Sequence, residues 1–292
     1  MKVKNDEITV WAESLDAFLA ERLSVASEDA HRVWEAMRYS TLGAGKRIRP
    51  YLTMKVCEIL GGDRETARWF GAALELVHTY SLIHDDLPCM DNDDFRRGRF
   101  TCHKMFDEAT AVLAGDALLT YAFEVISEAP ADDRQKVEAT RVLASRAGGN
   151  QMICGQIMDL TAENHTISFD TLKRMYAAKT GALMTAAVEL GCIAAHCTDE
   201  KTREAFRVYA GNVGMTFQII DDILDVYGDV TLGKPIGSDE KNGKNTYLTF
   251  VSPDKAAEDA KRLTLEAKEA IGGISGTEPL AELADKLLTR KK

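Results

Sequence analysis

The chain has 292 residues, with 45% hydrophobic and 7% aromatic residues, which is ordinary for a globular protein with a sizeable core. Its 46 acidic residues outnumber its 36 basic residues, so the formal net charge is −10 and nucleic acid is excluded as a bulk partner. No uninterrupted apolar run approaches a membrane span of about 20 residues, and residues 1–10 lack the apolar centre of a signal peptide. With six cysteines and no CxxC pair, we expect reduced thiols and a cytoplasmic location.

Apolar residues recur at helical spacing over long stretches, whereas strand-like alternation of Val, Ile and Thr is nearly absent. A helix is predicted over 108–128, with a core face formed by Val112, Leu119, Phe123 and Ile126. Another is predicted to begin after Ser168 as its N-cap and to continue toward Gly191. Residues 205–226 favour a further helix, and Ser252-Pro253 is the pattern of an N-cap followed by the first helical position.

Three segments have the weakest helical pattern: 91–101, 229–246 and 272–278. No shift of composition marks a domain boundary, and no short-period repeat is present. The sequence therefore predicts a single all-α domain over residues 1–292, a helical bundle around a central cavity.

Three aspartates lie close together where the helix before residue 91 is expected to end. Asp85 and Asp86 are adjacent, and Asp91 follows six residues after Asp85, a spacing that a straight helix would point in different directions. Pro88 lies between them, and a proline strains the preceding turn and removes a backbone donor. We therefore expect a kink or loop that returns Asp91 toward Asp85.

A second acidic cluster, Asp221, Asp222 and Asp225, follows about half the chain later. Asp221 and Asp225 are four residues apart, so both carboxylates project from one face of a helix. Apolar residues flank both clusters, and carboxylates crowded in poorly solvated surroundings raise one another's pKa. A divalent cation relieves that penalty and Mg²⁺ prefers hard oxygen ligands, so we predict Mg²⁺ sites at both clusters.

A solvated acidic helix end is the ordinary alternative for an Asp-rich run, and it would require no cation. Two clusters with apolar flanks favour the metal interpretation. An EF-hand is excluded at Asp91-Asn92-Asp93, because Phe95 replaces the next oxygen ligand and Arg96 replaces the required glycine.

Basic residues gather in four segments: Lys46-Arg47-Ile48-Arg49 after two glycines, Arg96-Arg97 after the first acidic cluster, Lys179 within an apolar helix, and Lys234 with Lys244 beyond the second cluster. Each alone would be an ordinary surface charge, but a cation within an apolar helix requires an anionic partner. Together with two Mg²⁺ clusters, these cations predict a site for two diphosphates, one bound through metal and one through Arg, Lys and His side chains.

The chain resembles the trans-isoprenyl diphosphate synthases over about residues 30–292. The resemblance rests on four blocks in that family's order and spacing: 45–50 (GKRIRP), 85–98, 179–181 (KTG) and 217–225 (FQIIDDILD). The bacterial short-chain farnesyl diphosphate synthases are the most similar group, because their first aspartate motif also has four residues between Asp86 and Asp91. Terpene cyclases share a lone DDxxD motif, so the combination of blocks carries the resemblance.

The resemblance implies a homodimer with about three Mg²⁺ ions per site, which act as Lewis acids on a diphosphate. Asp85 and Asp91 would bind two ions with support from Asp86, and Asp221 would bind the third, with Asp222 and Asp225 as indirect or water-mediated ligands. The implied catalytic residues are Asp85, Asp91, Asp221, Lys179 and Arg96.

Two substrate sites are implied as well. The allylic diphosphate would contact Arg96, Lys179 and Lys234, with Lys244 nearby, and its allylic carbons would lie beside Thr180 and Gln218. Isopentenyl diphosphate would be held by Lys46, Arg49, His78 and Arg97.

The implied reaction is head-to-tail transfer of a prenyl group from dimethylallyl or geranyl diphosphate to isopentenyl diphosphate through an allylic cation. Geranyl and geranylgeranyl diphosphate synthases of the same family are alternatives to a farnesyl diphosphate synthase. A class I terpene cyclase would ionise the same substrate without isopentenyl diphosphate, but its second metal site mixes Asn/Asp, Ser/Thr and Glu. Outside enzymology, an acidic scaffold or an inactive subunit is the alternative.

Product length should depend on the helix that ends at Asp85. Ser81 lies one turn before Asp85 on the same face, and Tyr80 lies beside it, about 7 Å along the helix axis. A bulky Tyr80 would floor the pocket and stop growth at fifteen carbons, although an ordinary core aromatic fits the same pattern. The basic C-terminus, 287–292, is expected to help close the site.

Overall fold

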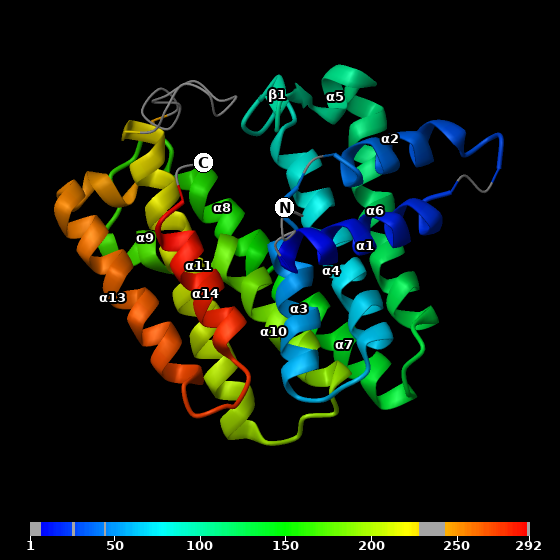
Figure 1. Ribbon diagram of the computed structural model, residues 1–292. Helices are drawn as coiled ribbons and strands as arrows, with labels where there is room; N and C mark the ends of the chain where they lie inside the picture. Colours follow the sequence, from blue (N-terminus) through cyan, green and yellow to red (C-terminus); the bar gives the residue numbers. More distant parts are fainter. Residues whose placement is uncertain (1–6, 25–26, 44, 228–242, 291–292) are drawn as a thin grey trace, which may run out of the picture.

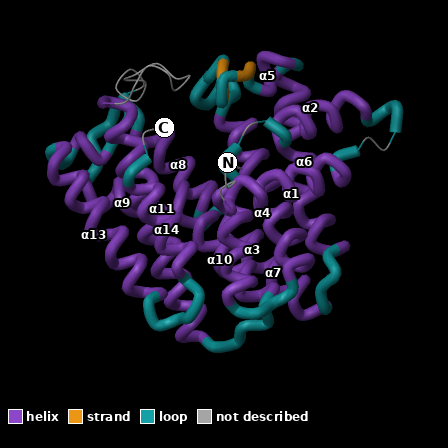
Figure 2. The backbone as a smooth tube through the Cα atoms, in the orientation of Figure 1, coloured by secondary structure: helices purple, strands orange, loops and turns teal. Residues whose placement is uncertain are grey.

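The computed structural model describes residues 7–24, 27–43, 45–227 and 243–290. The described chain is helical apart from one short antiparallel hairpin, in which β1 (Phe95–Arg96) pairs with β2 (Arg99–Phe100) (Figure 2). The all-α prediction is therefore confirmed. The hairpin falls within segment 91–101, one of the three segments with the weakest helical pattern.

The helices of the first half are α1 (Glu7–Arg22), α2 (His31–Thr41), α3 (Ile48–Ile59), α4 (Arg64–Asp85), α5 (Cys102–Met105), α6 (Glu108–Glu128), α7 (Asp133–Ala147) and α8 (Met152–Ala162). The second half has α9 (Phe169–Tyr176), the π-helical turn η1 (Ala177–Gly181), α10 (Ala182–Ala194), α11 (Glu200–Tyr227), the short 3₁₀ turn η3 (Tyr247–Thr249), α13 (Pro253–Ile271) and α14 (Glu278–Leu288). In Figure 1, α3, α4 and α10 lie centrally, with α11, α13 and α14 on one side and α1, α2 and α6 on the other. Because α10 packs against α3, α4, α7 and α11, it is the helix around which the bundle is assembled.

Side-chain caps fix several helix starts that the sequence indicates. Ser168 caps α9 and Ser252 caps α13, each by accepting a hydrogen bond from the backbone N–H three residues later, as predicted. Asp107 caps α6 in the same way, and this helix covers the predicted range 108–128.

One predicted core residue is wrong, since the Val112 side chain is 40% exposed. The helix α6 is apolar around most of its circumference, so periodicity alone does not select the face that packs. The buried face of α6 includes Ala111, Ala114 and Leu118. The two alanines are small, so α6 can approach α4 closely.

Two helical runs, α6 and Phe169–Ala194, are long and apolar enough to span a membrane by length and composition alone. Neither run is uninterrupted, because a helix that contains single polar residues can still reach a high mean hydropathy. In the structure 50% of the first apolar window and 67% of the second are buried, as in core helices.

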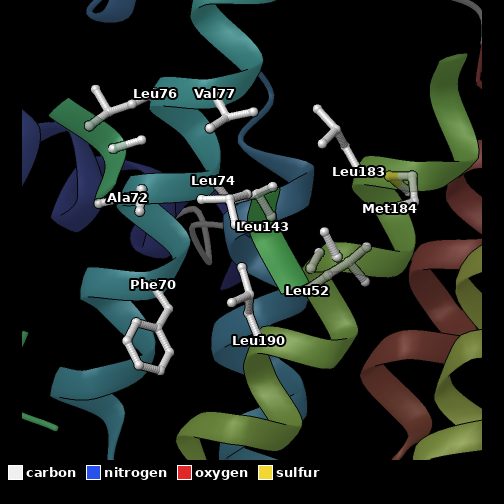
Figure 3. Close-up of a cluster of buried hydrophobic side chains, with 14 of the residues drawn as sticks. Leu52, Phe70, Ala72, Leu74, Leu76, Val77, Leu143, Leu183, Met184 and Leu190 are labelled. Atoms are coloured by element: carbon white, nitrogen blue, oxygen red, sulfur yellow. The ribbon is translucent and has the colours of Figure 1, made fainter. Parts of the chain in front are cut away.

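Two groups of buried apolar side chains hold the helices together. In the larger group, side chains from α3, α4, α7 and α10 lie close to one another, among them Leu52, Leu74, Leu143 and Leu190 (Figure 3). The smaller group joins α9, α11 and α13 through Leu172, Met175, Ile219, Ile220 and Ala256. The turn η1 separates the helix that serves the smaller group from the helix that serves the larger one.

Candidate functional site

The first acidic cluster lies where α4 ends at Asp85 and the chain makes tight turns. The Asp91 N–H donates to the Asp85 carbonyl oxygen at 2.9 Å, which returns Asp91 to Asp85 as predicted. Asp91 Oδ1 accepts a hydrogen bond from Lys244 Nζ at 2.8 Å, and Asp85 Oδ1 accepts one from Gln156 Nε2. Burial raises the pKa of Asp85, with Lys179 opposing the rise and Asp91 adding to it. An added cation would therefore stabilise this pair of carboxylates.

Asp86 faces a different partner. Its side chain is buried, and Arg96 grips it in a forked arrangement, with Nε 2.8 Å and 2.9 Å from the two carboxylate oxygens and Nη2 2.6 Å from Oδ1. Burial raises the pKa of Asp86, while the Arg96 hydrogen bond opposes that rise. The structure thus brings two predicted site residues together as an ion pair that fixes the turn behind Asp85.

Asp159 is a site residue that the motifs did not reveal. Its Oδ2 lies 2.6 Å from Lys179 Nζ and 4.0 Å from Lys244 Nζ, and Lys179 Nζ is also 4.0 Å from Asp85 Oδ2. Gln156, one turn earlier on α8, hydrogen-bonds Asp85. An amide and a carboxylate three residues apart on the largely apolar stretch 152–162 are the signal that could have identified both.

The turn η1 presents two predicted residues to the site. Gly155 lets α8 approach this turn closely, because a Cβ there would lie 2.2 Å from the Lys179 backbone nitrogen. The Lys179 ammonium points to Asp159, and the Thr180 hydroxyl donates to Gln218 Oε1 at 3.0 Å. Thr180 and Gln218, both predicted to lie beside the allylic carbons, are therefore in contact with each other. Turns of this π-helical kind are frequent at functional sites.

The second acidic cluster meets the C-terminal segment. Arg290 Nη2 lies 2.6 Å from Asp221 Oδ1 and donates to the Phe217 carbonyl oxygen at 2.8 Å. The Arg290 guanidinium also stacks over the Phe217 ring, 3.9 Å from its centroid. This contact brings Arg290, from the basic segment 287–292, to the second acidic cluster, and the role of that segment in closing the site stays a prediction. Asp225 lies one turn further along α11 and is partly buried.

Asp222 is directed away from that contact and is only 2% exposed. Its Oδ2 accepts hydrogen bonds from the Tyr176 hydroxyl at 2.6 Å and from the Tyr247 N–H at 2.7 Å. These hydrogen bonds give Asp222 a structural role, and its role as an indirect metal ligand stays a prediction. Asp222 fastens α9 and the segment that carries Lys244 to α11.

A cavity of about 610 Å³ lies between α3, α4 and the hairpin. Its lining includes all four residues predicted to hold isopentenyl diphosphate: Lys46, Arg49, His78 and Arg97. Burial lowers the pKa of Arg49, Arg97 and Lys46, and neighbouring cations lower the pKa of each further. A bound anion would offset both effects, so the cavity has the electrostatics of an anion site.

His78 is held neutral in this cavity. Burial and then the Arg49 charge keep its pKa well below the ordinary value. Arg49 Nη1 lies 3.4 Å from His78 Nε2, so the arginine donates and the imidazole nitrogen accepts. Arg49 Nε is buried without a hydrogen-bond partner among the described residues, which leaves a donor for a ligand.

Arg47, the third cation of its segment, also lines the cavity, but protein oxygens bind its guanidinium. It pairs with Glu75 at 2.6 Å and with Asp16 at 2.8 Å, and it donates to the Thr41 carbonyl oxygen at 2.5 Å. Its backbone has a φ of 49°, an uncommon left-handed conformation for a residue with a side chain. Arg47 therefore anchors the turn that presents its neighbours Lys46 and Arg49.

A second cavity, of about 410 Å³, is largely apolar and shares Arg49, His78 and Leu82 with the basic cavity. Its walls come from α4, α8 and α10, and include Tyr80, Ser81, Met152, Ile153, Ile157, Leu160 and Leu183. Asp85, Lys179 and Thr180 lie at its polar edge. Tyr80 is a buried residue of this lining, and its role as the floor stays a prediction. The Ser81 hydroxyl donates to the His78 carbonyl oxygen.

No three Asp, Glu, His or Cys side chains in the described ranges lie close enough together to form a complete metal site. The donor set still fits Mg²⁺, which proteins usually hold with one or two carboxylates together with substrate phosphates and water. Asp85 and Asp91 offer such a pair next to α4, and Asp221 offers another carboxylate from α11. Lys234, predicted to contact the allylic diphosphate, lies outside the described residues.

Comparison with known proteins identifies the relatives of this chain. The polyprenyl synthetase family profile matches residues 31–272. A farnesyl diphosphate synthase from Haemophilus influenzae is 42% identical over 260 residues, which is 88% of either chain. An FPP/GFPP synthase from Zymomonas mobilis superimposes with a TM-score of 0.87 at 38% identity and covers 97% of both chains. A geranyltransferase from Helicobacter pylori, complexed with magnesium and isoprenyl diphosphate, has a TM-score of 0.83 at 30% identity, over 99% of this chain and 98% of the other.

Proposed function

The chain belongs to the polyprenyl synthetase family, and we propose that it is a prenyltransferase that makes farnesyl diphosphate. It would condense isopentenyl diphosphate, head to tail, with dimethylallyl or geranyl diphosphate. The observation that carries this proposal is that an apolar cavity beside the first acidic cluster shares lining residues with a cation-lined cavity. Together they suit an apolar chain and two diphosphates.

The reaction breaks the bond between the allylic carbon and its diphosphate oxygen, which leaves with the electron pair. The alkene of isopentenyl diphosphate then forms a carbon–carbon bond to the allylic cation, and a proton passes to the released diphosphate. Mg²⁺, when bound by Asp85, Asp91 and Asp221, supplies Lewis-acid neutralisation of the leaving group. Lys179 and Lys244 would add positive charge at the diphosphate oxygens, as Lys234 is also proposed to do.

The remaining residues would position the substrates. Lys46, Arg49, His78 and Arg97 would bind isopentenyl diphosphate in the basic cavity. The oxygens of Thr180 and Gln218 would face the allylic carbons and stabilise developing positive charge there. The apolar walls would exclude water, which would otherwise trap the cation as an alcohol.

Asp86 and Arg96, bound to each other, would support the metal and the diphosphate from behind Asp85. Asp225 would contact the third ion indirectly. We also propose a cytoplasmic homodimer of single-domain subunits, with about three Mg²⁺ ions per site acting on the diphosphate. A relative of this chain solved with magnesium supports the metal.

Product analysis tests the proposed function. Purified protein is incubated with labelled isopentenyl diphosphate and either dimethylallyl or geranyl diphosphate, with Mg²⁺ or with excess chelator. We expect a fifteen-carbon diphosphate from both primers and no product with chelator. Products from an allylic diphosphate alone would indicate a terpene cyclase, and no turnover with Mg²⁺ would indicate an inactive subunit.

The family alone does not fix product length, since relatives of this chain include an FPP/GFPP synthase. Product length is expected to depend on Tyr80, because this residue lines the apolar cavity. Tyr80→Ala removes an aromatic ring from the wall of the apolar cavity, so products longer than fifteen carbons should become the main ones by chromatography. Tyr80→Phe is the matched control, since the Tyr80 hydroxyl is buried without a partner in the described residues and its loss should leave product length unchanged. An unchanged length in Tyr80→Ala would show that Tyr80 is not the floor.

A further inference from the structure

His84 occupies a place that the proposed mechanism does not use. It lies in the last turn of α4, between Tyr80 and Asp85, and it lines the apolar cavity beside Tyr80. The Tyr80 and His84 rings meet edge to face, with centroids 5.8 Å apart and planes at 74°. The His84 ring also contacts α6, where Nε2 lies 3.1 Å from the Val112 carbonyl oxygen and therefore donates a hydrogen bond to it.

The His84 ring fits against α6 only because residue 115 is glycine. A Cβ at Gly115 would lie 2.1 Å from His84 Nε2, 2.5 Å from Cδ2 and 2.8 Å from Cε1, so no side chain can be placed there unless the ring moves. Glycine in the middle of a helix is unfavourable relative to alanine, and Gly115 is buried within α6. The close approach of the imidazole accounts for glycine at this position.

The position of the Tyr80 ring depends on this contact. The Tyr80 hydroxyl is buried and has no hydrogen-bond partner in the described part of the chain, so packing alone holds the ring. His84 is one of the groups that pack against it, and His84 is in turn fixed by α6. A chain of contacts therefore runs from the α6 backbone through the imidazole to the wall of the apolar cavity.

We propose that His84 is a positioning residue for product length, which holds Tyr80 in place while seated in the recess that Gly115 provides. The proposal rests on the proposed prenyltransferase function. It adds a determinant on α6, a helix that contributes no residue to the lining of the apolar cavity. Product length then depends on where the imidazole lies. Displacing the ring from α6 should shorten the product, and removing the ring should lengthen it.

Gly115→Ala tests the recess. The added methyl should push the His84 ring toward Tyr80 and narrow the cavity, so the ratio of ten- to fifteen-carbon product should rise about tenfold, the scale of one methylene in an apolar pocket. Gly211→Ala is the matched control, because Gly211 lies in α11 and a Cβ there would meet nothing within 4 Å. That variant should keep the wild-type product ratio.

His84→Ala tests the packing of the imidazole against Tyr80. This variant keeps the proposal testable even if Gly115→Ala does not fold. Removing the imidazole frees space into which Tyr80 can turn, so the twenty- to fifteen-carbon ratio should rise about tenfold. In the double variant, Gly115→Ala should add little, because the ring that it displaces is gone. A folded Gly115→Ala and His84→Ala with wild-type product ratios would overturn the inference. Absence of any prenyl product from the wild type would instead reject the proposed function.

Discussion

Asp85→Asn is expected to lower kcat by about a thousandfold while leaving the fold intact. The asparagine keeps the shape of the side chain but removes the charge that would hold the metal at the mouth of the apolar cavity. Metal-ion catalysis contributes several kcal/mol, and each 1.36 kcal/mol is about tenfold in rate, so the loss of one ligand should reach this size. Steady-state assays at saturating substrates with a Mg²⁺ titration measure the effect.

Thermal unfolding measurements distinguish the expected loss of activity in Asp85→Asn from misfolding. Burial raises the pKa of Asp85, which means that its ionised form is disfavoured in the folded protein at pH values above the raised pKa. Removing that charge should therefore leave the melting temperature equal to or above that of the wild type when metal is absent. Asp94→Asn is the control in the same acidic run, since Asp94 is exposed and pairs with Lys104. A kcat for Asp85→Asn within about tenfold of the wild type would contradict a role in binding metal.

Arg49→Gln should raise the KM for isopentenyl diphosphate by about a hundredfold. The Arg49 side chain lines the basic cavity, and its buried Nε has no partner in the described ranges, so it offers a ligand a charged hydrogen bond. Hydrogen bonds to charged groups contribute about 1.5–3 kcal/mol, which corresponds to roughly 10- to 150-fold in affinity. The KM for the allylic diphosphate should change much less, because the cations proposed to bind it include Lys179 on η1 and Lys244, not Arg49.

Arg49→Lys is the conservative variant and should recover part of the affinity, since it keeps the charge without the forked geometry. The His78 resonance supplies a second readout, because the Arg49 charge is one cause of the low His78 pKa and that pKa should rise in Arg49→Gln. If the KM of both substrates increased equally, the basic cavity would not be selective for isopentenyl diphosphate.

Local sequence rules predicted the features that depend on a few neighbouring residues. The α6 boundaries and the caps at Ser168 and Ser252 follow from side chains that bond the backbone three residues away. The return of Asp91 to Asp85 follows from Pro88 in the same short turn. The cations that line the basic cavity follow from basic clusters in the sequence, and the family resemblance added His78 and the assignment of all four residues to one diphosphate.

Features that depend on packing between distant helices were not predictable in this way. Asp159 becomes a site residue only because α8 lies against η1, so that one carboxylate meets two lysines far apart in the sequence. Asp222 and Asp221 are adjacent in sequence and look equivalent, yet one faces Tyr176 and the other Arg290. The exposure of the Val112 side chain was not predicted, because α6 is apolar on several faces.

The π-helical turn η1 also makes the spacing of residues along this helix a structural constraint. A one-residue deletion in 177–181 would return the turn to ordinary α-helical bonding and leave both flanking helices intact. Because a π turn absorbs its extra residue locally, α9 would keep its face toward the smaller buried group and α10 would keep its face toward the larger one. The deletion would instead shift Lys179 and Thr180, which this turn presents to the site. Length variation in proteins concentrates in loops, but here one extra residue inside a helix positions two side chains of the site.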